Sequence, residues 1–186
     1  MERITLYHTG FARIREPDIH IGRRNADFGQ GFYLSPDREF SRRWAKLRRG
    51  EQTWLNTYEL TLDGLNVLRL SRDGAWYDLI FRNRTGRGTD DAEYDIITGP
   101  IANDTIYDTW GISTSGLLSR EQSLALLMIG PEYVQTVIRT ERAASRLRFV
   151  SAQVLPEAEI AQCRELVKRE EDDFQRRFAA AMERML

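Results

Sequence analysis

The sequence contains few residues of several types whose chemistry defines whole classes of protein. Its single cysteine, Cys163, excludes an internal disulfide framework, and with only His8 and His20 beside it we expect no metal site. No run approaches the roughly 20 apolar residues of a membrane span, and the segment MERITLYHTG lacks the apolar core of a signal peptide. These absences predict a cytoplasmic protein without membrane contact.

Lysine is scarce too, because the 27 basic residues comprise 25 arginines and only Lys46 and Lys168. The 28 acidic residues bring the net charge to −1, which excludes a polycation that coats nucleic acid or anionic membranes indiscriminately. A GC-rich genome and a phosphate-bearing ligand held by guanidinium groups both explain the arginines. A nucleic-acid-binding module has no other support here, since no recognisable motif for it is present.

The residues that are present predict one α+β domain. At 186 residues and 41% hydrophobic, the chain is long enough for a single core. Alternating and β-branched segments predict strands, and Asp63-Gly64 predicts that two of them form a hairpin. The expected strands are 3–8, 31–35, 53–62, 66–70, 94–97, 135–140 and 147–155, and the expected helices are 37–49, 76–81, 103–110 and one capped by Ser119 and Gln122.

The C-terminal segment differs in character from residues 1–155, which we take as the domain proper. Residues 157–186 contain no glycine or proline, and an apolar stripe predicts one long amphipathic helix. The helix either packs back on the domain or contacts a partner, such as a second copy of the chain in a homodimer. The stripe comprises Ile160, Val167, Phe174, Phe178 and Met182.

Two short motifs indicate a ligand site. LYHTG (6–10) places His8 at the end of a strand and Gly10 in the turn beyond it. DFGQGFYLS (27–35) places Gly29 and Gly31 around a loop, where the lack of a Cβ atom lets backbone approach a ligand. Either motif alone is weak, whereas both in this order, about 20 residues apart, are much more specific.

Together the motifs resemble the ADP-ribosyltransferase superfamily, in the His-Tyr-Glu branch of diphtheria-toxin-like and poly-ADP-ribose-polymerase-like enzymes. The sequence is most similar to an uncharacterised bacterial family, a domain of unknown function with DFGxGFY followed by a segment like YDIITGPIAND. The resemblance covers roughly residues 4–150. It implies an ADP-ribosyltransferase-like split β-sheet core with surrounding helices, and NAD as substrate.

The resemblance also implies roles for individual residues. His8 would bind an NAD ribose hydroxyl, Thr9 or Gly10 the nicotinamide carboxamide, and Tyr33 would stack on the nicotinamide ring. Ser41 and Trp44, eight and eleven residues after the tyrosine, match the carboxamide-binding serine and a second aromatic lid. Two aromatic faces suit a planar cationic ring. Taken singly, each of these residues is equally compatible with an ordinary structural role.

The loop and its arginines complete the expected NAD site. Gly31 would allow close approach to NAD, and Arg24 would contact its pyrophosphate. Arg24 belongs to a cluster around the DFGQGFY loop and the helix predicted after it, and helical spacing means that its members cannot all point to one ligand. The cluster comprises Arg23, Arg24, Arg38, Arg42, Arg43, Arg48 and Arg49.

The third triad position departs from the family pattern. Where the resemblance calls for a glutamate, the strand QTVIRT begins with Gln135, and Glu132 three residues earlier is the rival. Glutamine can hydrogen-bond a ribose but cannot act as a general base. Asp95 and Asp104 are spare carboxylates, suited to orienting an acceptor or to turn and cap chemistry.

These observations predict a mono-ADP-ribosyltransferase with His8, Tyr33 and Gln135 as its triad. The acceptor, whether protein or nucleic acid, is unidentified, and NAD hydrolysis is an alternative outcome. By analogy with the family, the enzyme would be the toxin of a toxin–antitoxin pair, and the C-terminal helix would be the element that docks the cognate antitoxin. The competing prediction is a catalytically silent fold that binds NAD, an ADP-ribosylated ligand or a protein partner.

Overall fold

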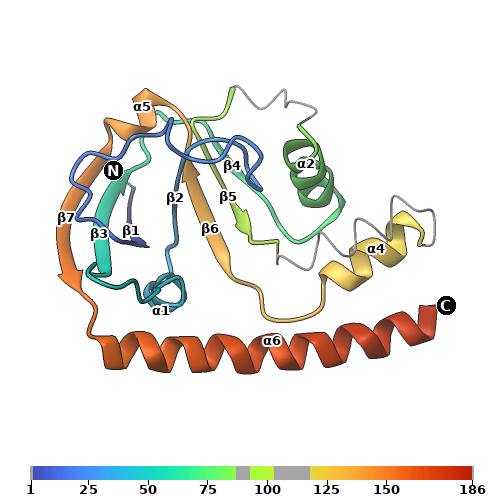
Figure 1. Ribbon diagram of the computed structural model, residues 1–186. Helices are drawn as coiled ribbons and strands as arrows, with labels where there is room; N and C mark the ends of the chain where they lie inside the picture. The colour runs from blue at the N-terminus through green and yellow to red at the C-terminus, as the bar shows by residue number, and fades with distance from the viewer. Residues whose placement is uncertain (1, 87–92, 103–117, 186) are drawn as a thin grey trace.

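The computed structural model describes residues 2–86, 93–102 and 118–185, and it has an α+β fold with two β-sheets (Figure 1). The strands are β1 (Arg3–Gly10), β2 (Phe32–Leu34), β3 (Trp54–Thr61), β4 (Val67–Arg69), β5 (Ile96–Pro100), β6 (Val134–Ile138) and β7 (Leu147–Val154). The helices are α1 (Arg38–Arg42), α2 (Gly74–Arg84), α4 (Arg120–Leu127), α5 (Glu141–Ala144) and α6 (Glu157–Met185). The predicted α+β class is confirmed.

One sheet has three antiparallel strands in the order β1-β3-β7, and the other has four in the order β2-β6-β5-β4. In the second sheet only β4 and β5 run parallel. The predicted hairpin at Asp63-Gly64 is therefore wrong, because β3 and β4 belong to different sheets. Asp63 and Gly64 do form a turn, but β3 forms its backbone hydrogen bonds with β1 and β7. Both of these strands are longer than β4 and pair with β3 over more residues.

The two sheets enclose the main core and meet at a backbone bridge. Tyr7 and Ser35 exchange backbone hydrogen bonds of 2.8 and 2.9 Å, which connects the end of β1 to the end of β2. Between the sheets, Leu6 and Tyr58 pack against Ile96 and Ile138. The bridge brings residues 8–10 close to the residues that flank Tyr33.

Alternate residues of β5 and β6 contribute to a second core on the opposite face of their sheet. Ile97 and Val137 pack there against Trp76 and Ile80 of α2, which covers this face (Figure 1). This division follows from the period of two along a strand. Because Gln135 is two residues from Val137, it shares this face, which becomes one wall of the site described below.

The helix α1 is much shorter than the predicted span 37–49. Asp37 caps it by accepting hydrogen bonds from the backbone of Glu39 and Phe40. After Arg42 the chain tightens into turns of three residues, seen in the hydrogen bonds Trp44 N to Ser41 O and Ala45 N to Arg42 O. This path buries Ala45 in a small cluster with Leu55, Leu155 and Ile160, which a continued α-helix does not reach.

The capping box predicted for α4 is confirmed. The Ser119 hydroxyl accepts from the backbone of Gln122 at 3.2 Å, and the Gln122 side chain accepts from the backbone of Ser119 at 2.8 Å. The predicted helix 103–110 lies outside the described residues. No helix within the described ranges combines the length and the apolar composition that a membrane span requires.

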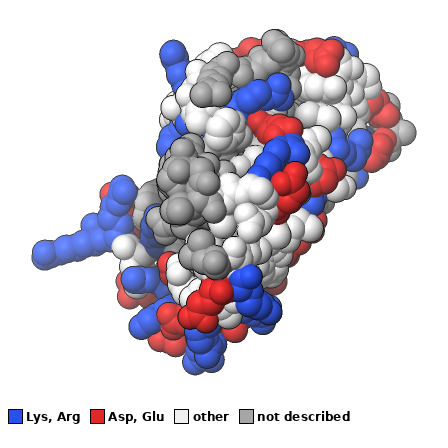
Figure 2. All heavy atoms as spheres, turned by 90° about the vertical axis from the view of Figure 1, so that its right-hand side faces the viewer, with Lys and Arg blue, Asp and Glu red and all other residues white. Residues whose placement is uncertain are grey.

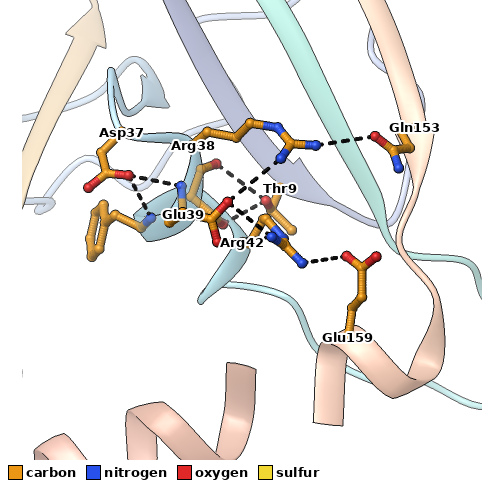
Figure 3. A network of polar contacts seen from close by, with 9 residues as sticks. Thr9, Asp37, Arg38, Glu39, Arg42, Gln153 and Glu159 are labelled. Carbon is orange, nitrogen blue, oxygen red and sulfur yellow. Dashed lines mark hydrogen bonds and ion pairs between the residues drawn. The ribbon is translucent and has the colours of Figure 1, made fainter. Parts of the chain in front are cut away.

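The predicted long C-terminal helix is present as α6 and runs along one edge of both sheets to α4 (Figure 1). Ile160, Cys163, Phe174 and Ala181 are buried against the rest of the chain. Near its start, Glu159 pairs with Arg42 of α1 at 2.5 Å (Figure 3). Of the predicted apolar stripe, Ile160 and Phe174 are thus buried within the chain, whereas Val167 is 37% exposed, and docking of a partner on α6 stays a prediction.

Candidate functional site

A cavity of about 540 Å³ is bordered by strands of both sheets and by α6. It is lined by β1, the loop before β2, β2, the α1 region, the end of α2, the segments around β5 and β6, and the middle of α6. Six of the residues singled out in the sequence line this one cavity: His8, Thr9, Tyr33, Ser41, Trp44 and Gln135. They come from four separate segments of the chain.

His8 is held as a neutral imidazole with a defined orientation. Its Nδ1 lies 2.8 Å from the Tyr33 carbonyl oxygen, which only accepts, so Nδ1 donates and carries the proton. Burial lowers the pKa of His8, although the hydrogen bond to Tyr33 opposes this effect. The remaining nitrogen, Nε2, therefore has a lone pair and is suited to accept a hydrogen bond from a ligand hydroxyl.

Gly10 keeps the space beside this nitrogen open. A Cβ atom at residue 10 would lie 3.2 Å from His8 Nε2, closer than an ordinary van der Waals contact, so a side chain there would crowd this nitrogen. Gly10 does not itself line the cavity, but its lack of a side chain preserves access to His8.

The Tyr33 hydroxyl fixes both its own ring and the loop before it. The hydroxyl accepts from Phe28 N at 2.9 Å and donates to Gly29 O at 2.7 Å. Burial raises the pKa of Tyr33, so the hydroxyl keeps its proton. Gly29 has φ +78°, a left-handed conformation that favours glycine. The DFGQG loop is thus a clamp for the tyrosine whose ring borders the cavity.

Thr9 and Ser41 connect the end of β1 to α1. The Thr9 hydroxyl donates to the Ser41 carbonyl at 2.6 Å, and the two hydroxyl oxygens are 3.3 Å apart (Figure 3). Ser41 is only 3% exposed, whereas Trp44 is 56% exposed and contacts Phe40 edge-on. The cavity therefore has a polar hydroxyl pair inside and an exposed aromatic ring at its rim.

Gln135 is fixed by a charged network that the sequence did not reveal. Its Nε2 donates to Asp27 Oδ2 at 3.1 Å, and Ala102 N donates to the same oxygen at 3.0 Å. The other oxygen, Oδ1, accepts from Arg84 Nε at 2.7 Å in an ion pair that is almost fully buried. Glu132, the rival to Gln135, is exposed and does not line the cavity.

A second charged cluster joins three elements at the α6 side of the cavity. Arg43 donates to the Tyr133 hydroxyl and to Glu170 of α6, and Tyr133 also donates to Glu170, at 2.9 and 3.0 Å from its two oxygens. Burial and the nearby Glu170 raise the pKa of Tyr133. Tyr133 lies directly before β6, two residues before Gln135, a proximity available in the sequence. Nothing marked Glu170, whose partners are distant in the chain.

Gly31 and Arg24 lie outside the cavity lining, and Asp95 has the second of its two predicted roles. Gly31 does not line the cavity, and its Cβ would collide with Ile138 O and the Val137 side chain, so its small size serves packing against β6. Arg24 is exposed and outside the lining, where Arg23 lies instead. Asp95 is buried away from the cavity and accepts from Asn66 N and the Thr140 hydroxyl, which is turn and cap chemistry. Asp104 lies outside the described residues.

The arginine cluster is mostly engaged with carboxylates of the same chain. Arg38 and Arg42 pair with Glu39, and Arg48 pairs with Glu51. On the face in Figure 2, basic and acidic side chains are interspersed, without a continuous basic surface among the described residues there. Of the cluster, Arg23 and Arg43 line the cavity.

Comparison with protein families identifies a match to DUF3990, described as a protein of unknown function, over residues 4–149. Because this match spans most of the chain, the protein belongs to that family. No curated protein and no solved structure matches the sequence. The matched region contains β1 through β6, and α6 lies beyond it.

Proposed function

We propose that the protein is a mono-ADP-ribosyltransferase that uses NAD as substrate. The observation that carries the proposal is that His8, Tyr33, Ser41, Trp44 and Gln135, matched to NAD-binding roles in the sequence, border one cavity. Its size lies within the range of about 300–1,000 Å³ that is usual for small-molecule sites.

The chemistry of the lining fits the nicotinamide riboside half of NAD. The neutral His8 offers Nε2 to a ribose hydroxyl, the Thr9 and Ser41 hydroxyls suit the carboxamide, and Tyr33 offers a ring to the cationic nicotinamide. In the proposed reaction the bond between nicotinamide and ribose C1′ breaks, and its electron pair leaves with nicotinamide. An acceptor nucleophile, or water, then bonds to C1′ and loses a proton.

The first test is turnover of NAD. Isotope-labelled NAD incubated with the protein and a cell lysate is expected to give a labelled macromolecule or free ADP-ribose. Neither product, together with no NAD binding by calorimetry, would reject the proposal.

The second test concerns Tyr33. Tyr33→Ala removes the aromatic ring and is expected to abolish measurable NAD binding, while unfolding stays cooperative. Tyr33→Phe is the matched control, since it keeps the ring and loses only the hydrogen bonds to Phe28 and Gly29. It is expected to retain NAD binding and to lower stability by about 1–3 kcal/mol. Undiminished affinity in Tyr33→Ala would exclude stacking.

The contact between Gln135 and Asp27 favours a second candidate, an NAD-binding protein without turnover. A glutamate at position 135 would place a carboxylate about 3 Å from Asp27, where like charges disfavour ionisation of both groups. The site is thus built for an amide rather than for a catalytic carboxylate. Saturable NAD binding without labelled product, and no gain in Gln135→Glu, would favour this candidate over the transferase.

A further inference from the structure

One corner of the cavity gathers donor groups around a single carboxylate. The Arg43 guanidinium and the Tyr133 hydroxyl both donate to Glu170, which comes from α6. All three residues line the cavity. We propose that Arg43 and Tyr133 form an anion subsite that takes the diphosphate of NAD, and that Glu170 occupies this subsite until the nucleotide displaces it.

The donors are held in place independently of Glu170. Phe40 and Tyr133 stack with ring centroids 4.5 Å apart, and the Arg43 guanidinium lies 4.7 Å from the centroid of the Tyr133 ring. An arginine stacked in this way has lost much of its rotational freedom before it binds. Its planar donors and the adjacent hydroxyl suit an anion that presents two oxygens, as a carboxylate or a phosphate does.

The other arginines of the lining are less suited to this role. Arg84 is committed to Asp27, in a pair whose side chains are 8% and 12% exposed. Arg23 lies in an exposed stretch before β2. Arg43 differs from Arg84 because its carboxylate partner is more accessible. Glu170 comes from α6, a separate wall of the cavity, and its side chain is 39% exposed.

Glu170 and a bound diphosphate exclude one another at Arg43. Both are anionic at neutral pH, and repulsion between them is strong where water is partly excluded. The adjacent Glu171 also lines the cavity and adds to this repulsion. Removal of the Glu170 charge should therefore strengthen binding of a diphosphate, although it also removes an ion pair that holds α6.

A matched pair of variants separates these two effects. Arg42–Glu159 also joins the α1 segment to α6, with side chains 18% and 37% exposed against 22% and 39% for Arg43–Glu170. Neither Arg42 nor Glu159 lines the cavity. Glu159→Gln therefore weakens the docking of α6 to a similar degree without altering the proposed subsite.

The experiment is calorimetric titration of inorganic pyrophosphate and of NAD into the full chain and its variants, each checked by thermal unfolding. Glu170→Gln is expected to bind both ligands about tenfold more tightly than the unaltered protein. Glu159→Gln is expected to match the unaltered protein. Arg43→Gln should weaken both ligands, and Arg43→Lys should restore only part of the affinity because a lysine lacks the planar donors.

The identity of the nucleotide rests on the proposed function. Titration of both pyrophosphate and NAD distinguishes failure of the anion subsite from failure of the proposed function. Pyrophosphate binding that depends on Arg43 and Glu170, without NAD binding in any variant, would support the subsite and reject NAD as ligand. NAD binding that is indifferent to Arg43 and Glu170 would overturn the subsite and leave the proposed function standing. Equal tightening in Glu170→Gln and Glu159→Gln would also overturn it, since helix docking alone would then explain the effect.

Discussion

His8 has its two ring nitrogens in different surroundings, and this asymmetry makes its protonation state important. Nδ1 is bound to the Tyr33 carbonyl, whereas Nε2 borders the space that Gly10 keeps open. Protonation would turn Nε2 from an acceptor into a donor. Ligand binding that needs the acceptor therefore requires the neutral ring.

The pH dependence of NAD binding follows from this requirement. Because burial lowers the pKa of His8 from 6.5, NAD affinity is expected to be constant above pH 6.5 and to fall only as pH drops through the lowered value. As pH falls below 6.5, the unfolded chain binds a proton on His8 before the folded chain does. The contribution of His8 to stability is therefore complete above pH 6.5 and is lost as pH falls toward the lowered pKa. Calorimetry between pH 5 and 8 measures the affinity.

Histidine variants provide the control for this profile. His8→Gln should remove the pH dependence in this window and weaken binding, whereas His20→Gln should leave both unchanged, because His20 is exposed and outside the cavity lining. An affinity that rises as pH falls would show that the protonated imidazole binds the ligand.

Gly10 allows the role of Nε2 to be tested without changing the histidine. Gly10→Ala places a methyl group 3.2 Å from Nε2, and strand backbone accommodates alanine. We expect NAD binding to weaken by about tenfold, the equivalent of about 1.4 kcal/mol. The unfolding midpoint in urea should fall modestly, because a contact of 3.2 Å forces the His8 ring to shift slightly while the fold is retained. Unaltered affinity would mean that no ligand atom occupies the space beside Nε2.

At the scale of elements, Asp95 joins β5 to the residues that precede β4 and α5. Burial opposes its ionisation, but hydrogen bonds from Asn66 N and the Thr140 hydroxyl, with the nearby Arg142, outweigh burial and lower the pKa of Asp95. Its contribution to stability is therefore present above pH 3.8 and is lost as pH falls through the lower folded value.

Asp95→Ala is expected to lower the free energy of unfolding by about 2–4 kcal/mol, since it removes a buried carboxylate that accepts from Asn66 N and the Thr140 hydroxyl. Urea denaturation measures the change, and NAD affinity should be unaffected because Asp95 does not line the cavity. Asp78→Ala is the control, because its ion pair to Arg120 is exposed and screened by solvent, so its loss should change the free energy of unfolding far less. Equal effects of the two variants would contradict the structural role of Asp95.

The sequence predicted elements better than their partners. Six of the seven described strands lie close to their predicted spans, because alternation and β-branching are local signals, whereas β5 overlaps its predicted span only at Ile96 and Ile97. The hairpin at Asp63-Gly64 failed because pairing depends on distant strands, and the helix after Asp37 ended early because burial of Ala45 depends on Leu155 and Ile160. Likewise His8 and Tyr33 were found from local motifs, whereas Glu170 reaches the cavity only through tertiary packing.

For the whole molecule, α6 is an integral part of the structure rather than an appendage to residues 1–155. A chain ending at residue 155 loses the burial of Ile160 and Phe174, 2% and 7% exposed, which should cost about 3–6 kcal/mol. Thermal unfolding followed by circular dichroism is expected to show a markedly lower midpoint. Leu166→Ala, at a position 50% exposed, should change it little. An unchanged unfolding midpoint in the shortened chain would show that residues 1–155 are fully stable without α6.

The position of α6 also has a consequence for biosynthesis. The ribosome releases β1 through β7 before it releases α6, so both sheets can form while one wall of the cavity is still inside the ribosome. Val167, Glu170 and Phe174 join the lining last. A nascent chain therefore holds an incomplete cavity, and its final shape is set only when the middle of the helix has left the ribosome.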